Sequence, residues 1–203
     1  FPTDSILAWV APYAVIQGAA FAGVGASQAV AADLENGFYD RLLMAPGSRL
    51  GLLLGPVTAA LLRVLLPFTV VLGVAFIGGV ELTQGIAGLL MLLLTAEGVA
   101  LVATFWGLSL VYKFRTQRSG ALVQVGVFVA MFLSVGQVPL GIMEGWLHAV
   151  ARVNPMTNLL RMARQGFVAE ITWADTWPGV VVILVGGAIF GAWAYAGLRK
   201  LNQ

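Results

Sequence analysis

Five long segments of the chain carry almost no charge, and this feature limits the possible folds more than any other. The segments cover residues 5–32, 50–80, 82–112, 119–140 and 176–198, and their only charged residues are Arg63 and Glu97. A helix needs about 20 apolar residues to cross a hydrocarbon core of roughly 30 Å. The sequence therefore predicts an all-α, polytopic transmembrane helical bundle with five spans, forming a single transmembrane domain over residues 1–203.

The composition excludes a soluble protein. Only 10% of the 203 residues are charged and 60% are hydrophobic, whereas soluble domains carry roughly 25% charged residues. The eleven Lys and Arg residues are scattered along the chain and form no basic stripe, so nucleic acid is not expected as a partner. The bilayer is the expected environment.

The short connections between the runs indicate the orientation. Segments 33–49, 113–118 and 199–200 hold seven of the eleven cations. Cytoplasmic loops of membrane proteins carry an excess of Lys and Arg, so these segments are predicted to be cytoplasmic and segment 141–172 to lie outside. The chain then starts outside. Because it begins with Phe1, we expect a preceding span, with a cleaved signal peptide as the alternative.

The two charged residues inside the runs are predicted to pair. Arg63 and Glu97 lie on consecutive runs, equally far along the chain from Val80, which predicts equal depth on two antiparallel helices. A lone charge at that depth costs at least ~2.5 kcal/mol. An intramembrane ion pair is therefore expected. The alternative is that Arg63 reaches the cytoplasmic surface while Glu97 is protonated or faces a polar route.

Segment 33–49 is predicted to contain a short helix outside the bilayer. Asn36-Gly37 precedes it and Pro46-Gly47 follows it, and both pairs are typical of helix boundaries. Phe38, Leu42 and Ala45 share one helical face. A short amphipathic helix at this position either lies on the lipid surface or docks into a partner.

The outer segment 141–172 is too apolar for a solvated loop. Its two helical patterns are separated by Asn154-Pro155, because the residue before proline rarely stays helical. We expect two short helices, and the alternative is an interfacial loop. Arg161 and Arg164 lie three residues apart on one face. They are predicted to face water, with lipid phosphates as the alternative.

The sequence offers no recognisable chemistry of its own. The chain has no Cys and one His, His148, so neither a metal site nor a catalytic site is predicted. A P-loop needs Gly before its Lys, but Lys113 follows Tyr112 and Lys200 follows Arg199. No cofactor is expected on this chain. Two glycine pairs with GxxxG spacing, 51/55 and 187/191, could allow close helix packing.

Two stretches of sequence resemble a known family. Residues 35–49, Glu-Asn-Gly-Phe-Tyr-Asp-Arg-Leu-Leu-Met-Ala-Pro-Gly-Ser-Arg, followed by Leu52-Leu-Leu-Gly55, resemble the coupling segment of membrane subunits of type-2 ABC exporters, with the daunorubicin-resistance-like branch as the nearest match. Residues 154–157 with Leu160-Arg161 and Gly166-Phe167 resemble that family's second signature. That family has six spans and an N-terminal elbow helix, so the five runs would correspond to its second to sixth spans.

The resemblance implies a function and its residues. The chain would be the permease of an ATP-driven exporter in the inner (plasma) membrane. A second membrane subunit would complete the dimer, and separate ABC ATPase subunits would carry ATP and magnesium. Segment 141–172 would be a re-entrant hairpin. The residues that would couple to the ATPase are Glu35, Gly37, Phe38, Asp40, Arg41, Leu42, Pro46 and Arg49.

In the same family the first and fourth runs would line the dimer interface and the substrate route. The residues predicted to line the route are Tyr13, Gln17, Gln28, Gln124, Phe128, Met131, Phe132 and Gln137. Polar groups are costly against lipid, so they should face protein or substrate. A route with few charges suits an amphipathic drug-like, lipidic or glycan substrate. The alternative function is a secondary-active transporter that uses Glu97 for ion or proton coupling.

Overall fold

The structure, a computed structural model, describes residues 5–44 and 48–202 and is built from helices. The all-α prediction is confirmed. The long helices are α1 (Ile6–Glu35), α3 (Arg49–Ile77), α4 (Gly85–Phe114) and α8 (Trp173–Arg199), and the shorter ones are α2 (Phe38–Met44), α5 (Arg118–Phe132), α6 (Gly145–Val153) and α7 (Pro155–Arg164), with 3-10 turns η1 (Leu140–Ile142) and η2 (Lys200–Asn202). By length and composition, α1, α3, α4 and α8 can cross a membrane.

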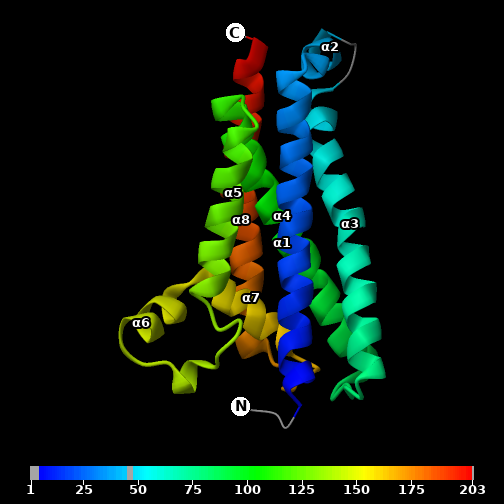
Figure 1. Cartoon of the computed structure of the whole chain (residues 1–203), viewed down its shortest axis with the longest axis vertical. Helices are drawn as coiled ribbons and strands as arrows, with labels where there is room; N and C mark the ends of the chain where they lie inside the picture. Colours follow the sequence, from blue (N-terminus) through cyan, green and yellow to red (C-terminus); the bar gives the residue numbers. More distant parts are fainter. Residues whose placement is uncertain (1–4, 45–47, 203) are drawn as a thin grey trace.

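The fourth predicted span is shorter than its apolar run. Helix α5 has 15 residues and ends at Phe132, which gives it a length of about 22 Å, whereas the run continues to Leu140. Residues 133–139 leave the helix, and the count of five spans is not confirmed. Helix α5 starts at the same end of the bundle as the end of α4 and runs toward the opposite end, but it stops short of that end (Figure 1).

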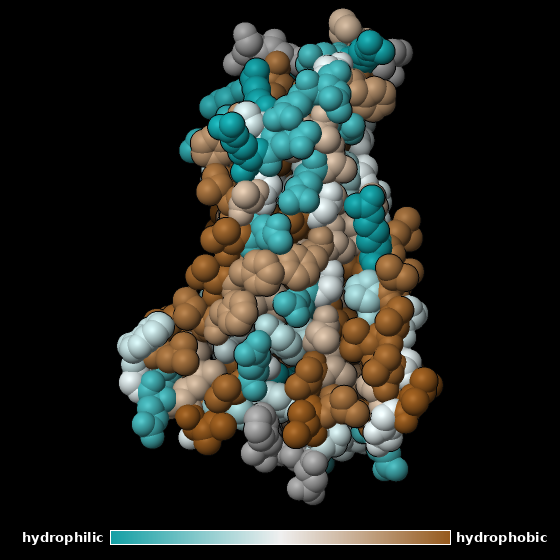
Figure 2. Space-filling view, viewed as in Figure 1, coloured by the Kyte–Doolittle hydropathy of each residue, from teal (hydrophilic) through white to brown (hydrophobic). Residues whose placement is uncertain are grey.

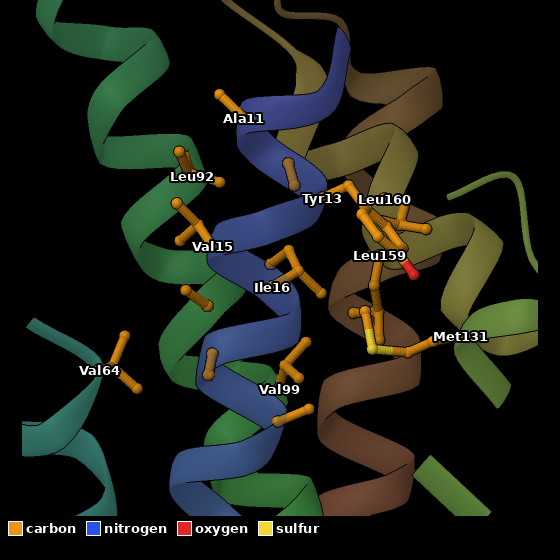
Figure 3. Packing of buried hydrophobic residues seen from close by; sticks show 14 of the residues in the cluster. Ala11, Tyr13, Val15, Ile16, Val64, Leu92, Val99, Met131, Leu159 and Leu160 are labelled. Carbon is orange, nitrogen blue, oxygen red and sulfur yellow. The ribbon is translucent and has the colours of Figure 1, made fainter. Parts of the chain in front are cut away.

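Helix α1 is the centre of the bundle and contacts α2, α3, α4, α5 and α7. Small residues allow this packing, because a Cβ on Gly23 would lie only 2.8 Å from the carbonyl oxygen of Ala100 on α4. Helix α8 packs on α4 in a similar way, with Gly187 and Gly191 facing Leu101 and Phe105. The buried cluster between these helices consists mainly of small and branched aliphatic side chains, with Tyr13 and Met131 among them (Figure 3).

The other glycine pair does not mediate helix packing. A Cβ on Gly55 would meet nothing within 4 Å, and one on Gly51 would meet only the hydroxyl of Ser48. The exposed surface of α3 is instead strongly apolar, with Leu62, Leu66 and Ile77 between 70% and 90% exposed. Apolar side chains cover the flanks of the molecule (Figure 2). Such a surface is stable only against lipid or another protein.

The two ends of the bundle differ in the way the charge pattern predicts. Helix α2, the connection between α4 and α5, and the C-terminal end of the chain lie at one end (Figure 1). These are the three basic segments. Helices α6 and α7 lie at the opposite end, beside the start of α1 (Figure 1). From the predicted orientation, we refer to the first as the cytoplasmic end and to the second as the outer end.

Candidate functional site

The short helix α2 begins where the sequence predicts. Helix α1 ends at Glu35, and Gly37 takes a positive φ of 68°, which glycine adopts without a steric penalty. This turn reverses the chain so that α2 lies over the cytoplasmic end of the bundle (Figure 1). The helix has only seven residues, so it depends on tertiary contacts for its stability.

Tyr39 attaches α2 to the bundle. Its side chain is 3% exposed and packs with Leu53, Leu108 and Leu198, from α3, α4 and α8. Its hydroxyl lies 2.8 Å from that of Tyr112 on α4, and it donates a longer bond, 3.4 Å, to the carbonyl oxygen of Leu52. Burial raises the pKa of Tyr39 above its usual value, so the hydroxyl remains a donor at neutral pH.

The apolar face predicted for α2 is divided in the structure. Leu42 is partly buried and packs toward the bundle, together with Leu43. Phe38 and Met44 point away from it and are 50% and 80% exposed. Leu42 therefore lies on the side of α2 that faces the bundle, together with Tyr39, while its predicted part in coupling remains a prediction. Of the other predicted face and coupling residues, Ala45 and Pro46 lie outside the described residues.

The charged coupling residues lie around α2. Asp40 and Arg41 are exposed on the helix, and Arg49 is exposed at the start of α3. Glu35 has a defined structural role, because its Oε1 accepts a 2.7 Å hydrogen bond from the backbone N–H of Gln117. This contact links the end of α1 to the N-terminal end of α5, where the helix dipole favours a carboxylate.

The predicted route residues separate into two groups. Tyr13 and Met131 are 7% and 1% exposed and belong to the core, and Tyr13 packs against Gly136. Phe128 lies edge-on to Phe21 of α1, with ring centroids 5.2 Å apart. The remaining residues lie on the surface of this chain: Gln28, Gln124, Phe132 and Gln137 are exposed, and Gln17 is half-buried.

These surface residues belong to the face formed by α1 and α5. Polar side chains interrupt the apolar surface along the middle of this face (Figure 2). A separate apolar pocket of about 140 Å³ lies between α1, α4, α5, α7 and α8, with Trp106, Met156 and Leu159 among its walls. None of the exposed predicted route residues lines this pocket. The face of α1 and α5 is thus more polar than the apolar flanks of the molecule.

The predicted ion pair between Arg63 and Glu97 is not formed. The Oε2 atom of Glu97 is buried without a hydrogen-bond partner, and Arg63 is exposed. Arg63 lies near Gly25, whereas Ala100, one turn beyond Glu97, lies against Gly23. Arg63 is therefore closer to the cytoplasmic end than Glu97. Helices α3 and α4 each make more extensive contacts with α1 than with each other. An equal number of residues from Val80 to Arg63 and to Glu97 therefore does not bring the two side chains together.

The outer segment forms the predicted pair of helices. Asn154 separates α6 from α7, and its Oδ1 accepts a hydrogen bond from the N–H of Met156 at the start of α7. Its Nδ2 donates to the carbonyl oxygens of Ala130 and Leu133, at 2.7 and 2.9 Å. One side chain therefore caps α7 and satisfies the C-terminal end of α5.

The prediction that both arginines of α7 face water is wrong for Arg164. Arg161 is exposed, but Arg164 is only 4% exposed. The guanidinium of Arg164 stacks 3.5 Å from the centre of the Trp9 ring and donates to the carbonyl oxygens of Val135 and Gly136. The backbone after α5 is not helical, so the carbonyl oxygens of Val135 and Gly136 can accept hydrogen bonds from outside the helix. These bonds explain why Arg164 is buried.

Comparison with known proteins places these features in a family. Residues 4–168 match the sequence profile of the family described as "ABC-2 type transporter". The chain belongs to this family. It is also similar to "Probable multidrug ABC transporter permease YbhR" of Escherichia coli K12 and of Escherichia coli O157:H7. Each is 28% identical over 180 residues, which cover 86% of this chain and 47% of the relative. The chain thus spans about half the length of these curated relatives.

Membership of the ABC-2 type transporter family is consistent with the two stretches of sequence that resemble its exporters. Three residues of structural importance were nevertheless missed: Tyr39, Asn154 as a tether of α5, and Arg164 as a buried cation. For Tyr39 the sequence gave some indication of a structural role, because a large aromatic side chain on a short predicted helix favours packing against the bundle. Nothing in the sequence marks the carbonyl oxygens of Val135 and Gly136 as acceptors.

Proposed function

We propose that this chain is the membrane subunit of an ATP-driven exporter in the inner (plasma) membrane. The observation that carries the proposal is α2. Its inner side is fixed by Tyr39, while Phe38 and Met44 are exposed at the basic end of the bundle. An apolar surface in this position is suited to a protein partner, and family membership makes that partner an ABC ATPase subunit.

The partner would supply the energy. ATP and magnesium would bind to the ATPase, because this chain has no P-loop. Closure of the ATPase pair would move α2, and Tyr39 would pass the movement to α3 and α4 through its contacts with Leu52 and Tyr112. Purification of the intact protein should bring a P-loop ATPase with it, and purification without one would count against the exporter.

The route is proposed to lie between two membrane subunits. Gln17, Gln28, Gln124, Phe132 and Gln137 are accessible on the face of α1 and α5, where a second copy or a homologue would cover them. The similarity to a protein named a multidrug permease supports an amphipathic drug-like substrate, and the daunorubicin-resistance-like resemblance belongs to the same proposal. Lipidic or glycan substrates fit the same mixture of amides and aromatic rings.

One observation favours the alternative of secondary-active transport. The Oε2 atom of Glu97 is buried without a hydrogen-bond partner inside a membrane-crossing helix, and such carboxyl groups occur in proton pathways. Family membership favours the exporter. The two functions differ in their energy source, so transport that persists with a disabled ATPase but stops in a Glu97→Gln variant would establish the alternative.

The sharpest test of the exporter is a charge placed on the exposed side of α2. Phe38→Asp should abolish coupling, so that ATP hydrolysis continues while transport falls to background. A matched control is Trp146→Asp, because Trp146 is 71% exposed at the outer end. Equal transport by the Phe38→Asp variant and the wild type would remove the role of α2, provided that both variants insert at normal levels.

A further inference from the structure

A pocket of about 250 Å³ opens at the outer end of the bundle, between α1, α7 and the start of α8. Its walls include Trp9, Val135, Arg161, Arg164, Gln165 and Asp175. This volume is far above the roughly 10–15 Å³ that one water molecule requires. Arg161 is exposed, so the pocket is open to the surface at its side chain.

The inner wall of the pocket contains buried polar groups. Arg164 and Gln165 are 4% and 1% exposed. The guanidinium of Arg164 donates from Nε to the carbonyl oxygen of Trp9 at 3.3 Å, from Nη1 to that of Val135 at 2.7 Å, and from Nη2 to that of Gly136 at 2.6 Å. These bonds use three of its five N–H groups, so the other two form no hydrogen bond within the part of the chain that the structure describes.

The acceptors of Arg164 are neutral, and its charge lacks a counter-charge. Buried charges are costly unless they are paired. Asp175 also lines the pocket, but it lies in the first turn of α8, where its Oδ2 accepts a 3.4 Å bond from the hydroxyl of Thr172 and the helix dipole stabilises it. Within residues 5–44 and 48–202, neither Arg161 nor Arg164 forms an ion pair. Two arginines and one aspartate leave the pocket with an excess positive charge.

We propose that this pocket binds the phosphate group of a ligand with a net negative charge, which supplies the missing negative charge. Arg161 would contact the phosphate at the mouth, and the two remaining N–H groups of Arg164 would contact it from the inner wall. Guanidinium groups bind phosphate through paired hydrogen bonds. The phosphate belongs either to a lipid headgroup of the outer leaflet or to a free anion. This proposal does not depend on the transport function, since binding can be measured without ATP or an ATPase.

The test is binding to the full-length protein in zwitterionic detergent. The probes are inorganic phosphate, short-chain phosphatidylglycerol and short-chain phosphatidylcholine, and the measurement is the rise in unfolding temperature with probe concentration. Arg161→Gln removes the cation at the mouth without touching the core. Arg152→Gln is the matched control, because Arg152 is an exposed arginine of α6 outside the pocket wall.

We expect phosphatidylglycerol or phosphate to stabilise the wild type and the Arg152→Gln variant equally. Arg161→Gln should weaken the apparent affinity by about tenfold, equivalent to ~1.4 kcal/mol. Stabilisation by phosphatidylglycerol alone identifies a lipid headgroup site, and stabilisation by both probes identifies a site for free phosphate. The proposal is overturned if neither anion binds, if phosphatidylcholine binds as well as phosphatidylglycerol, or if the two arginine variants behave alike.

Arg164→Lys provides a second measurement. Lysine keeps the charge but cannot reproduce the planar fork of the guanidinium. A folded Arg164→Lys variant should bind the anion at least tenfold more weakly than the wild type, and unchanged binding would overturn the part assigned to Arg164. If the variant does not fold, the Arg161→Gln comparison decides the proposal.

Discussion

Glu97 shows how the energetic role of a single residue depends on its neighbours. Its Oε2 atom is buried without a hydrogen-bond partner, and Arg63 is too far toward the cytoplasmic end to neutralise it. A buried carboxyl group without a partner destabilises a fold, because burial penalises its charged form. We therefore expect this half-buried carboxyl group to contribute little to the stability of the bundle.

We expect Glu97→Gln to leave the yield of folded protein and the unfolding temperature unchanged or slightly raised. The amide fills the same volume without a charge. Arg63→Gln should also have a small effect on the unfolding temperature, because the side chain of Arg63 is exposed. Thermal unfolding of the two single variants and the double variant checks this. A large loss in both single variants, with no further loss in the double variant, would show that the two residues do interact.

Tyr39 and Tyr112 form a second residue-scale feature, and here the interaction is present. We expect Tyr39→Phe to lower stability by about 1–3 kcal/mol, because it leaves the buried hydroxyl of Tyr112 without its partner. Tyr112→Phe should cost less, because the hydroxyl of Tyr39 keeps its bond to the carbonyl oxygen of Leu52. The double variant should lose less than the sum of the two, because no unpaired hydroxyl remains. Additive losses in a double-mutant cycle of unfolding would contradict the pairing.

At the scale of elements, hydropathy predicts where helices exist but not where they end. The apolar runs predicted α1, α3, α4 and α8 to within a few residues. The apolar run over residues 119–140 predicted a longer helix than the structure shows, because α5 ends at Phe132. The carbonyl oxygens released there are satisfied by Asn154 and Arg164, which lie at the start and end of α7. No local rule can detect an acceptor that is satisfied from so far along the chain.

Asn154 offers a clean test of this link between elements. Asn154→Asp keeps the oxygen that caps α7 but loses the Nδ2 donor to Ala130 and Leu133. Asn154→Ala loses both functions. We expect Asn154→Asp to lower the unfolding temperature at least as much as Asn154→Ala, because it keeps the N-cap, typically worth about 1 kcal/mol, but places a carboxylate oxygen against the carbonyl oxygens of Ala130 and Leu133. Equal unfolding temperatures for Asn154→Asp and the wild type would show that the tether to α5 contributes nothing.

The close packing of α1 against α4 makes a further prediction at this scale. Gly23→Val should strongly lower the yield of folded protein, because even a Cβ would lie 2.8 Å from the carbonyl oxygen of Ala100. Gly55→Val is the matched control, since a Cβ there meets nothing within 4 Å. Size-exclusion chromatography of the two variants measures the difference. Similar profiles for both would mean that α1 and α4 do not pack as described.

At the scale of the whole molecule, the arrangement of the ends follows from charge and connectivity together. Helix α4 ends at the cytoplasmic end and α8 begins at the outer end (Figure 1). The chain must return between them, and α5 with residues 133–139 provides that path although the helix is short. The sequence predicts this return from the alternation of basic and apolar segments. It could not predict that α7 fills the outer end beside the unwound residues.

The orientation can be tested directly because the chain has no cysteine. Ala149 is exposed on α6 at the outer end, and Ser48 is exposed just before α3 at the cytoplasmic end. Each can be replaced by a single cysteine. A membrane-impermeant maleimide added to intact cells should label Ala149→Cys, and it should label Ser48→Cys only after permeabilisation. The unsubstituted protein is the control for background. The opposite pattern would reverse the orientation, and it would place α2 where no cytoplasmic ATPase could contact it.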